Sequence, residues 1–232
     1  MAAPAAAART PNAVWGSSAT DVFVVGGRGL IWHWNGTAWS EMTLPAIAGT
    51  PDLAAVWGPA GGPVYAVGSS GTIARYDGTE WTVDDRVAQD LVGIWGTGAG
   101  DIWAIGVRGL IAHFDGAAWD DNASLGGNIA SNIEGIWGSG PDQIFVVGGT
   151  SVWRYDGAAW TESTLPSPSA ARAVWGRAAN DVYIVGGGGM AFHYDGAAWT
   201  DIGAEHDWTF NAIWGDAAQI RAVGDLGTIS VR

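Results

Sequence analysis

The sequence lacks several residue types, and each absence narrows what the protein can be. It has no cysteine, which excludes disulfides and thiolate chemistry. All ten basic residues are arginines, and against 23 acidic residues they leave a formal net charge of −13. Because the neutralisation of phosphates needs a basic stripe, neither nucleic acid nor an anionic membrane surface is an expected partner. An acidic surface instead favours solubility and cationic ligands.

Long apolar runs are also missing. No stretch approaches the roughly 18 apolar residues of a membrane-spanning helix. The first nine residues have neither the basic start nor the apolar length of a signal peptide. We therefore expect a soluble protein that inserts into no membrane. The absence of cysteine leaves the compartment open, and a secreted or cell-surface location is favoured.

One short motif, by contrast, is present six times. Ala13-Val14-Trp15-Gly16 returns in related form at residues 55–58, 93–96, 135–138, 173–176 and 212–215. Each copy begins a unit of about 40 residues with short apolar segments separated by glycine-containing turns. Such a period predicts a β-propeller, in which each unit is one blade of four strands that must pack on its neighbours.

The turns between third and fourth strands are the clearest local signal. Five units carry Asp-Gly or Asn-Gly there, at residues 35–36, 77–78, 115–116, 156–157 and 195–196. Both residues of such a pair tolerate positive φ, so the pair predicts a tight hairpin turn. No segment has helical periodicity. We predict an all-β chain, a six-bladed β-propeller with four antiparallel strands per blade.

The whole chain, residues 1–232, is predicted to be a single domain. The predicted blades are residues 13–43, 53–84, 91–121, 133–163, 171–202 and 210–232, the last completed by residues 2–8. Residues 2–8 are expected to supply the outermost strand that the sixth blade lacks and so to close the ring. Pro4 is tolerable there because an outermost strand is hydrogen-bonded on one side only.

The Trp-Gly strands and the Asp-Gly-x-x-Trp turns carry a resemblance to known repeats. They resemble bacterial propeller repeats of the Asp-box type, although here the aspartate directly precedes the glycine and the serine of that motif is not kept. They are more distantly similar to WD repeats, without the Gly-His and Trp-Asp pairs. The resemblance covers essentially the whole chain and implies the propeller fold. It implies no function, because propellers host lectins, scaffolds, hydrolases and lyases.

Residues that recur blade by blade are interpreted as structural. Eleven of the 16 tryptophans stand either before the repeated glycine or at the start of a fourth strand, and we expect them to pack between blades. His33, His113 and His193 lie on third strands, too far from the axis to converge on a metal ion. We expect them to be polar ties, with the aspartates at positions 21, 101 and 181 as candidate partners. No metal site is predicted.

Residues that do not recur are the candidates for function. Variation collects in the connections from fourth to first strands and in the turns between second and third strands, which we expect on one face, the variable face. The residue that enters each inner strand on this face is Asn12, Ala54, Val92, Glu134, Arg172 and Asn211 in turn. The candidate ligand-binding residues are Asn12, Glu134, Arg172, Asn211 and Trp208, the last in a connecting loop where packing and ligand contact are both open.

No catalytic signature and no cofactor motif is present, so no catalytic residue and no cofactor is predicted. We expect a monomeric, non-catalytic binding or scaffold module that recognises a protein or other ligand on the variable face. One alternative is a glycan-binding propeller that uses exposed tryptophans such as Trp208. A second alternative is a hydrolase or lyase with a polar or Ca²⁺-binding site at the mouth of the channel.

Overall fold

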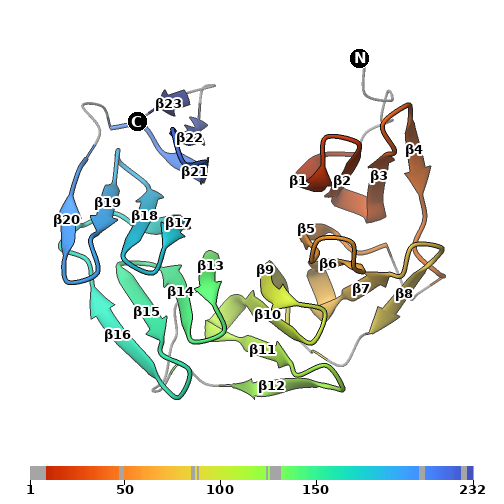
Figure 1. The fold of residues 1–232 in the computed structure, drawn as a ribbon, viewed down its shortest axis with the longest axis horizontal. Coiled ribbons are helices and arrows are strands. Elements are labelled where there is room, and N and C mark those ends of the chain that lie inside the picture. The colour runs from red at the N-terminus through yellow and green to blue at the C-terminus, as the bar shows by residue number, and fades with distance from the viewer. Residues whose placement is uncertain are drawn as a thin grey trace. The chain divides into compact units, whose positions relative to one another are not determined.

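The computed structural model describes residues 9–46, 50–84, 87, 89–123, 125, 132–203, 207–225 and 229–231. In these residues the regular structure is β-strand apart from three 3-10 turns, which agrees with the all-β prediction. The chain forms two compact units, Met1–Ala123 and Ser124–Arg232. In each sheet, antiparallel strands lie side by side in chain order (Figure 1).

The first unit contains three four-stranded sheets. Sheet 1 is β1 (Pro11–Ser18), β2 (Asp21–Gly26), β3 (Leu30–Trp34) and β4 (Trp39–Met42), with the 3-10 turn η1 (Gly27–Gly29). Sheet 2 is β5 (Leu53–Trp57), β6 (Val64–Gly68), β7 (Ile73–Tyr76) and β8 (Trp81–Asp84), with η2 (Ser69–Gly71). Sheet 3 is β9 (Leu91–Gly98), β10 (Asp101–Gly106), β11 (Ile111–Phe114) and β12 (Trp119–Ala123), with η3 (Val107–Gly109).

The second unit contains two four-stranded sheets and one sheet with three described strands. Sheet 4 is β13 (Gly135–Gly140), β14 (Gln143–Gly148), β15 (Ser151–Tyr155) and β16 (Trp160–Thr164). Sheet 5 is β17 (Ala171–Ala178), β18 (Asp181–Gly186), β19 (Ala191–Tyr194) and β20 (Trp199–Asp201). Sheet 6 is β21 (Phe210–Gly215), β22 (Ile220–Gly224) and β23 (Ile229–Val231). Residues 2–8, the predicted fourth strand of this sheet, lie outside the described residues.

Within each unit the hydrophobic core lies between consecutive sheets. One cluster joins Phe23 and Ile31 of sheet 1 to Val56 and Trp81 of sheet 2. In the second unit Phe145 of sheet 4 packs in the same way with side chains of sheet 5. A four-stranded sheet of this length cannot shield its own two faces, and stacking against the next sheet buries them.

The Trp-Gly motif is explained by this stacking. A Cβ added to Gly58 would lie 3.2 Å from the ring of Trp15, and one added to Gly96 would lie 2.8 Å from the ring of Trp57. The second unit repeats the arrangement with Gly176 under Trp137 and Gly215 under Trp175. Within each unit the tryptophan of one sheet therefore lies over the motif glycine of the next, which confirms that Trp15, Trp57, Trp137 and Trp175 pack between sheets.

The Asp-Gly turns differ in one respect from the prediction. Only the glycine takes a positive φ, for example 104° at Gly78. The aspartate accepts hydrogen bonds instead: the Asp77 carboxylate receives the backbone N–H groups of Thr79 at 2.8 Å and Glu80 at 3.0 Å. The predicted hairpin turn is therefore present, but only its glycine uses a positive φ, and the aspartate contributes through its side chain, which caps the turn.

Candidate functional site

Three of the candidate residues that enter the inner strands, Asn12, Arg172 and Asn211, occupy β-bulges. The pairing register of β1 with β2 shifts between Pro11 and Ala13, so Asn12 is the extra residue. The same shift makes Arg172 the extra residue of β17 and Asn211 that of β21. Because a bulged residue is released from the ladder, its side chain can be aimed independently of its neighbours.

A repeated glycine makes room for each bulge. Gly68, which ends β6, pairs with Leu53, and a Cβ added to it would lie 2.1 Å from the carbonyl oxygen of Asp52. The same clash, at 2.0 to 2.4 Å, would occur at the glycine that ends the second strand of all six sheets. The close approach also joins two loops, since the N–H of Ser69 donates to the Asp52 carbonyl at 2.9 Å. Within each sheet the turn between the second and third strands and the connection into the first strand thus lie next to each other.

In the second unit the candidate residues form a chain of hydrogen bonds. The Arg172 guanidinium donates from Nη1 to Oδ1 of Asn211 at 2.6 Å. Asn211 in turn donates from Nδ2 to the carboxylate of Asp225 at 2.7 Å. All three side chains are exposed. Asp225 therefore orients the Asn211 amide, and the amide oxygen holds one edge of the guanidinium while the rest of that group faces solvent.

The remaining candidates are placed differently. Glu134 is exposed and its backbone N–H donates to the Val147 carbonyl at 2.8 Å, but its side chain is not part of the chain of hydrogen bonds at Arg172. Asn12, in the first unit, donates from Nδ2 to the Leu53 carbonyl at 2.9 Å and so ties β1 to β5. This bond gives Asn12 a structural role between sheets 1 and 2.

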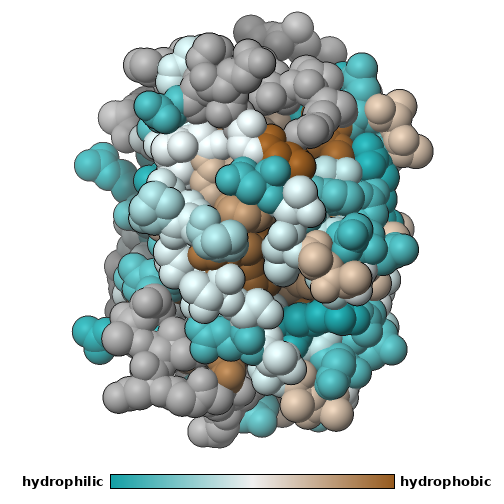
Figure 2. Space-filling view, turned by 90° about the vertical axis from the view of Figure 1, so that its left-hand side faces the viewer, coloured by the Kyte–Doolittle hydropathy of each residue, from teal (hydrophilic) through white to brown (hydrophobic). Residues whose placement is uncertain are grey.

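Trp208 keeps an exposed indole, with 44 % of its surface accessible. Its carbonyl accepts the N–H of Gly189 at 2.7 Å, and Pro51 accepts the N–H of Gly29 in the same way in the first unit. The backbone of Trp208 is therefore held in the same way as that of Pro51 in the first unit. The other large apolar side chains exposed among the described residues are Val14, Trp214 and Val223. In the view of Figure 2 apolar surface forms a narrow, broken band between hydrophilic side chains.

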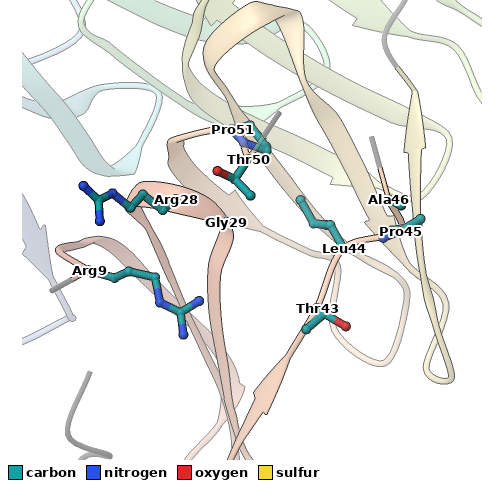
Figure 3. Close-up of a pocket in the computed structure, with 9 residues that line it drawn as sticks. All are labelled: Arg9, Arg28, Gly29, Thr43, Leu44, Pro45, Ala46, Thr50 and Pro51. Atoms are coloured by element: carbon teal, nitrogen blue, oxygen red, sulfur yellow. The ribbon is translucent and has the colours of Figure 1, made fainter. Parts of the chain in front are cut away.

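The structure shows a pocket in the first unit that the sequence did not predict. It has a volume of about 280 Å³ and lies between the β2–β3 turn and the connection from β4 to β5. Arg9 and Arg28 lie on one side of it, and Leu44, Pro45 and Ala46 lie on the other (Figure 3). No motif marks these residues, because the pocket depends on how a non-repeating connection folds over a repeated turn.

The histidine ties predicted from the repeat are confirmed. Nε2 of His33, His113 and His193 lies 2.7 to 2.8 Å from the aspartate of the same sheet, at positions 21, 101 and 181. Each imidazole also stacks on the aromatic ring beside it, for example His113 on Trp103 with centroids 4.0 Å apart. Burial acts to raise the pKa of Asp181, but hydrogen bonds from Arg177 and His193 outweigh it and leave the pKa below its usual value. These partners make the histidines structural.

The turn carboxylates show a similar effect at the surface. The hydrogen bond from the Thr79 hydroxyl, together with the backbone N–H groups of Glu80 and Thr79, lowers the pKa of Asp77 to about 2. The pKa values of Asp115, Asp156 and Asp195 are lowered by backbone hydrogen bonds in the same turn.

In the part of the chain that the structure describes, no group of three or more histidines and carboxylates is placed to hold a metal ion. The same part has no helix long and apolar enough to cross a membrane.

Comparisons with known proteins identify the fold. No protein-family model matches the sequence, and no curated protein sequence matches it. Among solved structures, YCF48 bound to D1 peptide superposes with a TM-score of 0.75 at 14% identity, over 96% of this chain and 77% of that one. Virginiamycin B lyase from Staphylococcus aureus gives 0.77 at 16% identity, over 96% and 83%. The WD40 β-propeller domain of Doa1 gives 0.72 at 10% identity, over 97% and 82%.

These likenesses, with the antiparallel four-stranded sheets, define the protein as a β-propeller of about six blades. At such low identity they show the fold alone. The narrower resemblance to Asp-box and WD repeats stays a prediction.

Proposed function

We propose that the protein is a non-catalytic binding module, acting as a monomer, that takes a peptide or protein ligand on its variable face. The observation that carries this proposal is the chain from Asp225 through Asn211 to Arg172. It fixes an exposed guanidinium on the bulge of β17, whereas the side chain of Arg177, on the same strand, is bonded to Asp181. A guanidinium that is already held in place can donate hydrogen bonds to a carboxylate or carbonyl group with little further loss of conformational entropy on binding.

Two further observations support a protein ligand. The structural neighbours include a propeller, YCF48, that was solved with a bound D1 peptide. The face also combines bulges and non-repeating connections, the elements that carry binding residues on repeat scaffolds.

The test is an array of random 15-residue peptides probed with the purified protein. We expect a subset of peptides to bind, and Arg172→Ala and Asn211→Ala to lose that subset. Arg177→Ala is the matched control on the same strand and should keep it, with circular dichroism confirming that each variant is folded. If no peptide binds, or if Arg172→Ala binds the same subset equally well, the proposal is wrong.

Trp208 supports a second candidate, a glycan-binding propeller. An exposed indole on a fixed backbone offers a flat apolar face for a sugar ring, and the exposed Asp207 beside it can accept hydrogen bonds from hydroxyl groups. A glycan array distinguishes the two candidates. Binding that is lost in Trp208→Ala and kept in Arg172→Ala would favour the glycan, and the absence of any glycan signal would reject it.

We also propose that residues 2–8 add the fourth strand to sheet 6 and close the ring of blades. The support is the pattern of the other sheets, each of which has four strands in the order of the chain. This closure is tested by the proline series argued in the Discussion.

A further inference from the structure

The inner strands of sheets 4 and 5, β13 and β17, lie side by side in the second unit (Figure 1). A Cβ added to Gly135, the first residue of β13, would lie 3.1 Å from the carbonyl oxygen of Arg172. Glu134 and Arg172 come directly before the uninterrupted ladder of their strands, which continues from Gly135 and from Ala173. A carboxylate and a guanidinium, both exposed, therefore occupy equivalent positions on neighbouring strands.

These unlike charges do not pair with each other. Glu134 and Arg172 are both described, and no hydrogen bond or ion pair joins them. The guanidinium is bonded on the side of sheet 6 instead, where Oδ1 of Asn211 accepts Nη1 at 2.6 Å. Asp225 holds the Asn211 amide through Nδ2 and so keeps its oxygen toward the arginine. A neutral amide thus orients Arg172 without cancelling its charge, and the Glu134 carboxylate is left to solvent.

An arginine and a glutamate that are kept apart in this way are suited to a ligand that carries both charges. The guanidinium attracts a carboxylate, whereas Glu134 beside it repels a second acid and attracts a cation. In an extended peptide, residues i and i+2 point to the same side and lie about 7 Å apart. An acidic and a basic residue at this spacing can therefore reach two side chains that start from neighbouring strands.

We propose that Arg172 and Glu134 form one recognition site for a peptide with an acidic and a basic residue on the same side. The ligand carboxylate binds Arg172 and the ligand cation binds Glu134. This inference rests on the function proposed above, which assigns a ligand group to Arg172 alone. Glu134 adds the specificity: it selects peptides with a lysine or arginine near the acidic residue and disfavours purely acidic ones.

The test compares acetyl-Asp-Ala-Lys-amide with acetyl-Asp-Ala-Gln-amide, each titrated into the protein and followed by NMR chemical shifts. Both should shift the backbone amides of Gly135 and Ala173, and the lysine peptide should bind about threefold more tightly, as expected for one exposed ion pair. In Glu134→Gln the two peptides should bind equally. Arg172→Ala should weaken both, because each has the same aspartate.

Glu162→Gln is the matched control. Glu162 is an exposed glutamate of the same sheet, but it lies on the outermost strand β16, where Ser151 donates to it. This variant should keep the preference for lysine. Glu134→Arg should reverse the preference, so that acetyl-Asp-Ala-Glu-amide binds more tightly than the lysine peptide. Equal binding of the lysine and glutamine peptides to the unmodified protein, or a preference that persists in Glu134→Gln, would overturn the proposal.

Its failure is distinguishable from failure of the function proposed for Arg172. If neither tripeptide shifts the two amides, the two-charge site is rejected, while longer peptides of the array can still bind through Arg172. If array peptides bind and depend on Arg172 but carry no excess of lysine or arginine, only the role given to Glu134 is wrong. An excess of basic residues that disappears when the array is probed with Glu134→Gln would support it.

Discussion

At the scale of single residues, the repeated glycines matter because there is no space for a side chain at their positions. In four sheets, at Gly58, Gly96, Gly176 and Gly215, the motif glycine lies between a backbone carbonyl of its own sheet and the tryptophan of the preceding one. At Gly96 an added Cβ would lie 2.5 Å from the Asp101 carbonyl oxygen and 2.8 Å from the ring of Trp57. Neither contact can relax without moving a strand or the partly buried indole of Trp57.

We therefore expect Gly96→Ala to destabilise the protein by about 1 to 3 kcal/mol, the usual cost of overpacking. The free energy of unfolding from urea denaturation measures this. Gly98→Ala is the control on the same strand, since an added Cβ there meets nothing within 4 Å. It should change stability by less than about 0.5 kcal/mol. Equal effects of the two substitutions would contradict the role given to the Trp-Gly contact.

The turn aspartates predict how stability depends on pH. The folded-state pKa of Asp77 is lowered to about 2, so this carboxylate stabilises the folded protein above its unfolded-state pKa of roughly 3.9 and loses that contribution as the pH falls toward 2. The lowered pKa values of Asp115, Asp156 and Asp195 act in the same direction. The free energy of unfolding should therefore decrease steeply as the pH is lowered through the acid range.

Asp77→Asn should make that fall shallower. An asparagine oxygen accepts the same turn hydrogen bonds without titrating, as Asn35 of sheet 1 does from Thr37 and Ala38 at 3.0 and 2.9 Å. Asp77→Ala is the control, because it loses the turn bonds at every pH and should be less stable even at pH 7. Urea denaturation between pH 7 and pH 2 gives the slopes. An unchanged slope in Asp77→Asn would exclude the turn as a source of the acid sensitivity.

At the scale of elements, the sequence predicts the sheets well because each one is specified by local signals that agree. The β-branched runs, the Asp-Gly turns and the repeated tryptophans all point to the same strands. The bulges were not predicted. In the sequence Asn12, Arg172 and Asn211 resemble ordinary strand residues. A bulge depends on which residue of the opposite strand can approach closely, and here that residue is a glycine 13 or 14 positions further along the chain.

The candidate site was predictable only in part for the same reason. Arg172 and Asn211 stand out in the sequence as non-repeating polar residues, and the structure brings them together. Asp225 was not chosen for this site, because its contact with Asn211 arises from the loop after β22 folding beside the bulge of β21. The pocket at Arg28 was missed because its walls come from segments whose spacing varies between repeats.

The stacking of sheets gives a prediction at this scale. Trp57 of β5 packs in the cluster that joins sheets 2 and 3. Trp57→Ala should therefore cost about 3 kcal/mol, within the range for removal of a large aromatic side chain from a core. Trp208→Ala, which removes an indole that is 44% exposed, should cost less than about 1 kcal/mol. Similar losses in urea denaturation would mean that the Trp-Gly contact contributes little to stacking.

At the scale of the whole molecule, the repeat makes every sheet depend on its neighbours, so a sheet with fewer strands should be the least stable. Sheet 6 has three described strands where the other sheets have four. Its exposed Trp214, at 57%, stands at the position of the tryptophans that cover a glycine elsewhere. If residues 2–8 pair with β23 as predicted, they protect this sheet, and their hydrogen bonds should be measurable.

Proline substitutions test that pairing, because only alternate residues of an outermost strand donate hydrogen bonds to the sheet. An outermost strand donates from every second residue only, and Pro4 already occupies one position. Ala6→Pro has the same parity as Pro4 and should be neutral, whereas Ala5→Pro and Ala7→Pro each remove a donor and should destabilise sheet 6. Hydrogen exchange of the β22 and β23 amides reports the effect, with β6 and β7 as internal controls. If all three prolines leave exchange unchanged, residues 2–8 do not form the closing strand. An equal effect of all three would point to a disturbed backbone rather than a paired strand, because only a ladder distinguishes alternate residues.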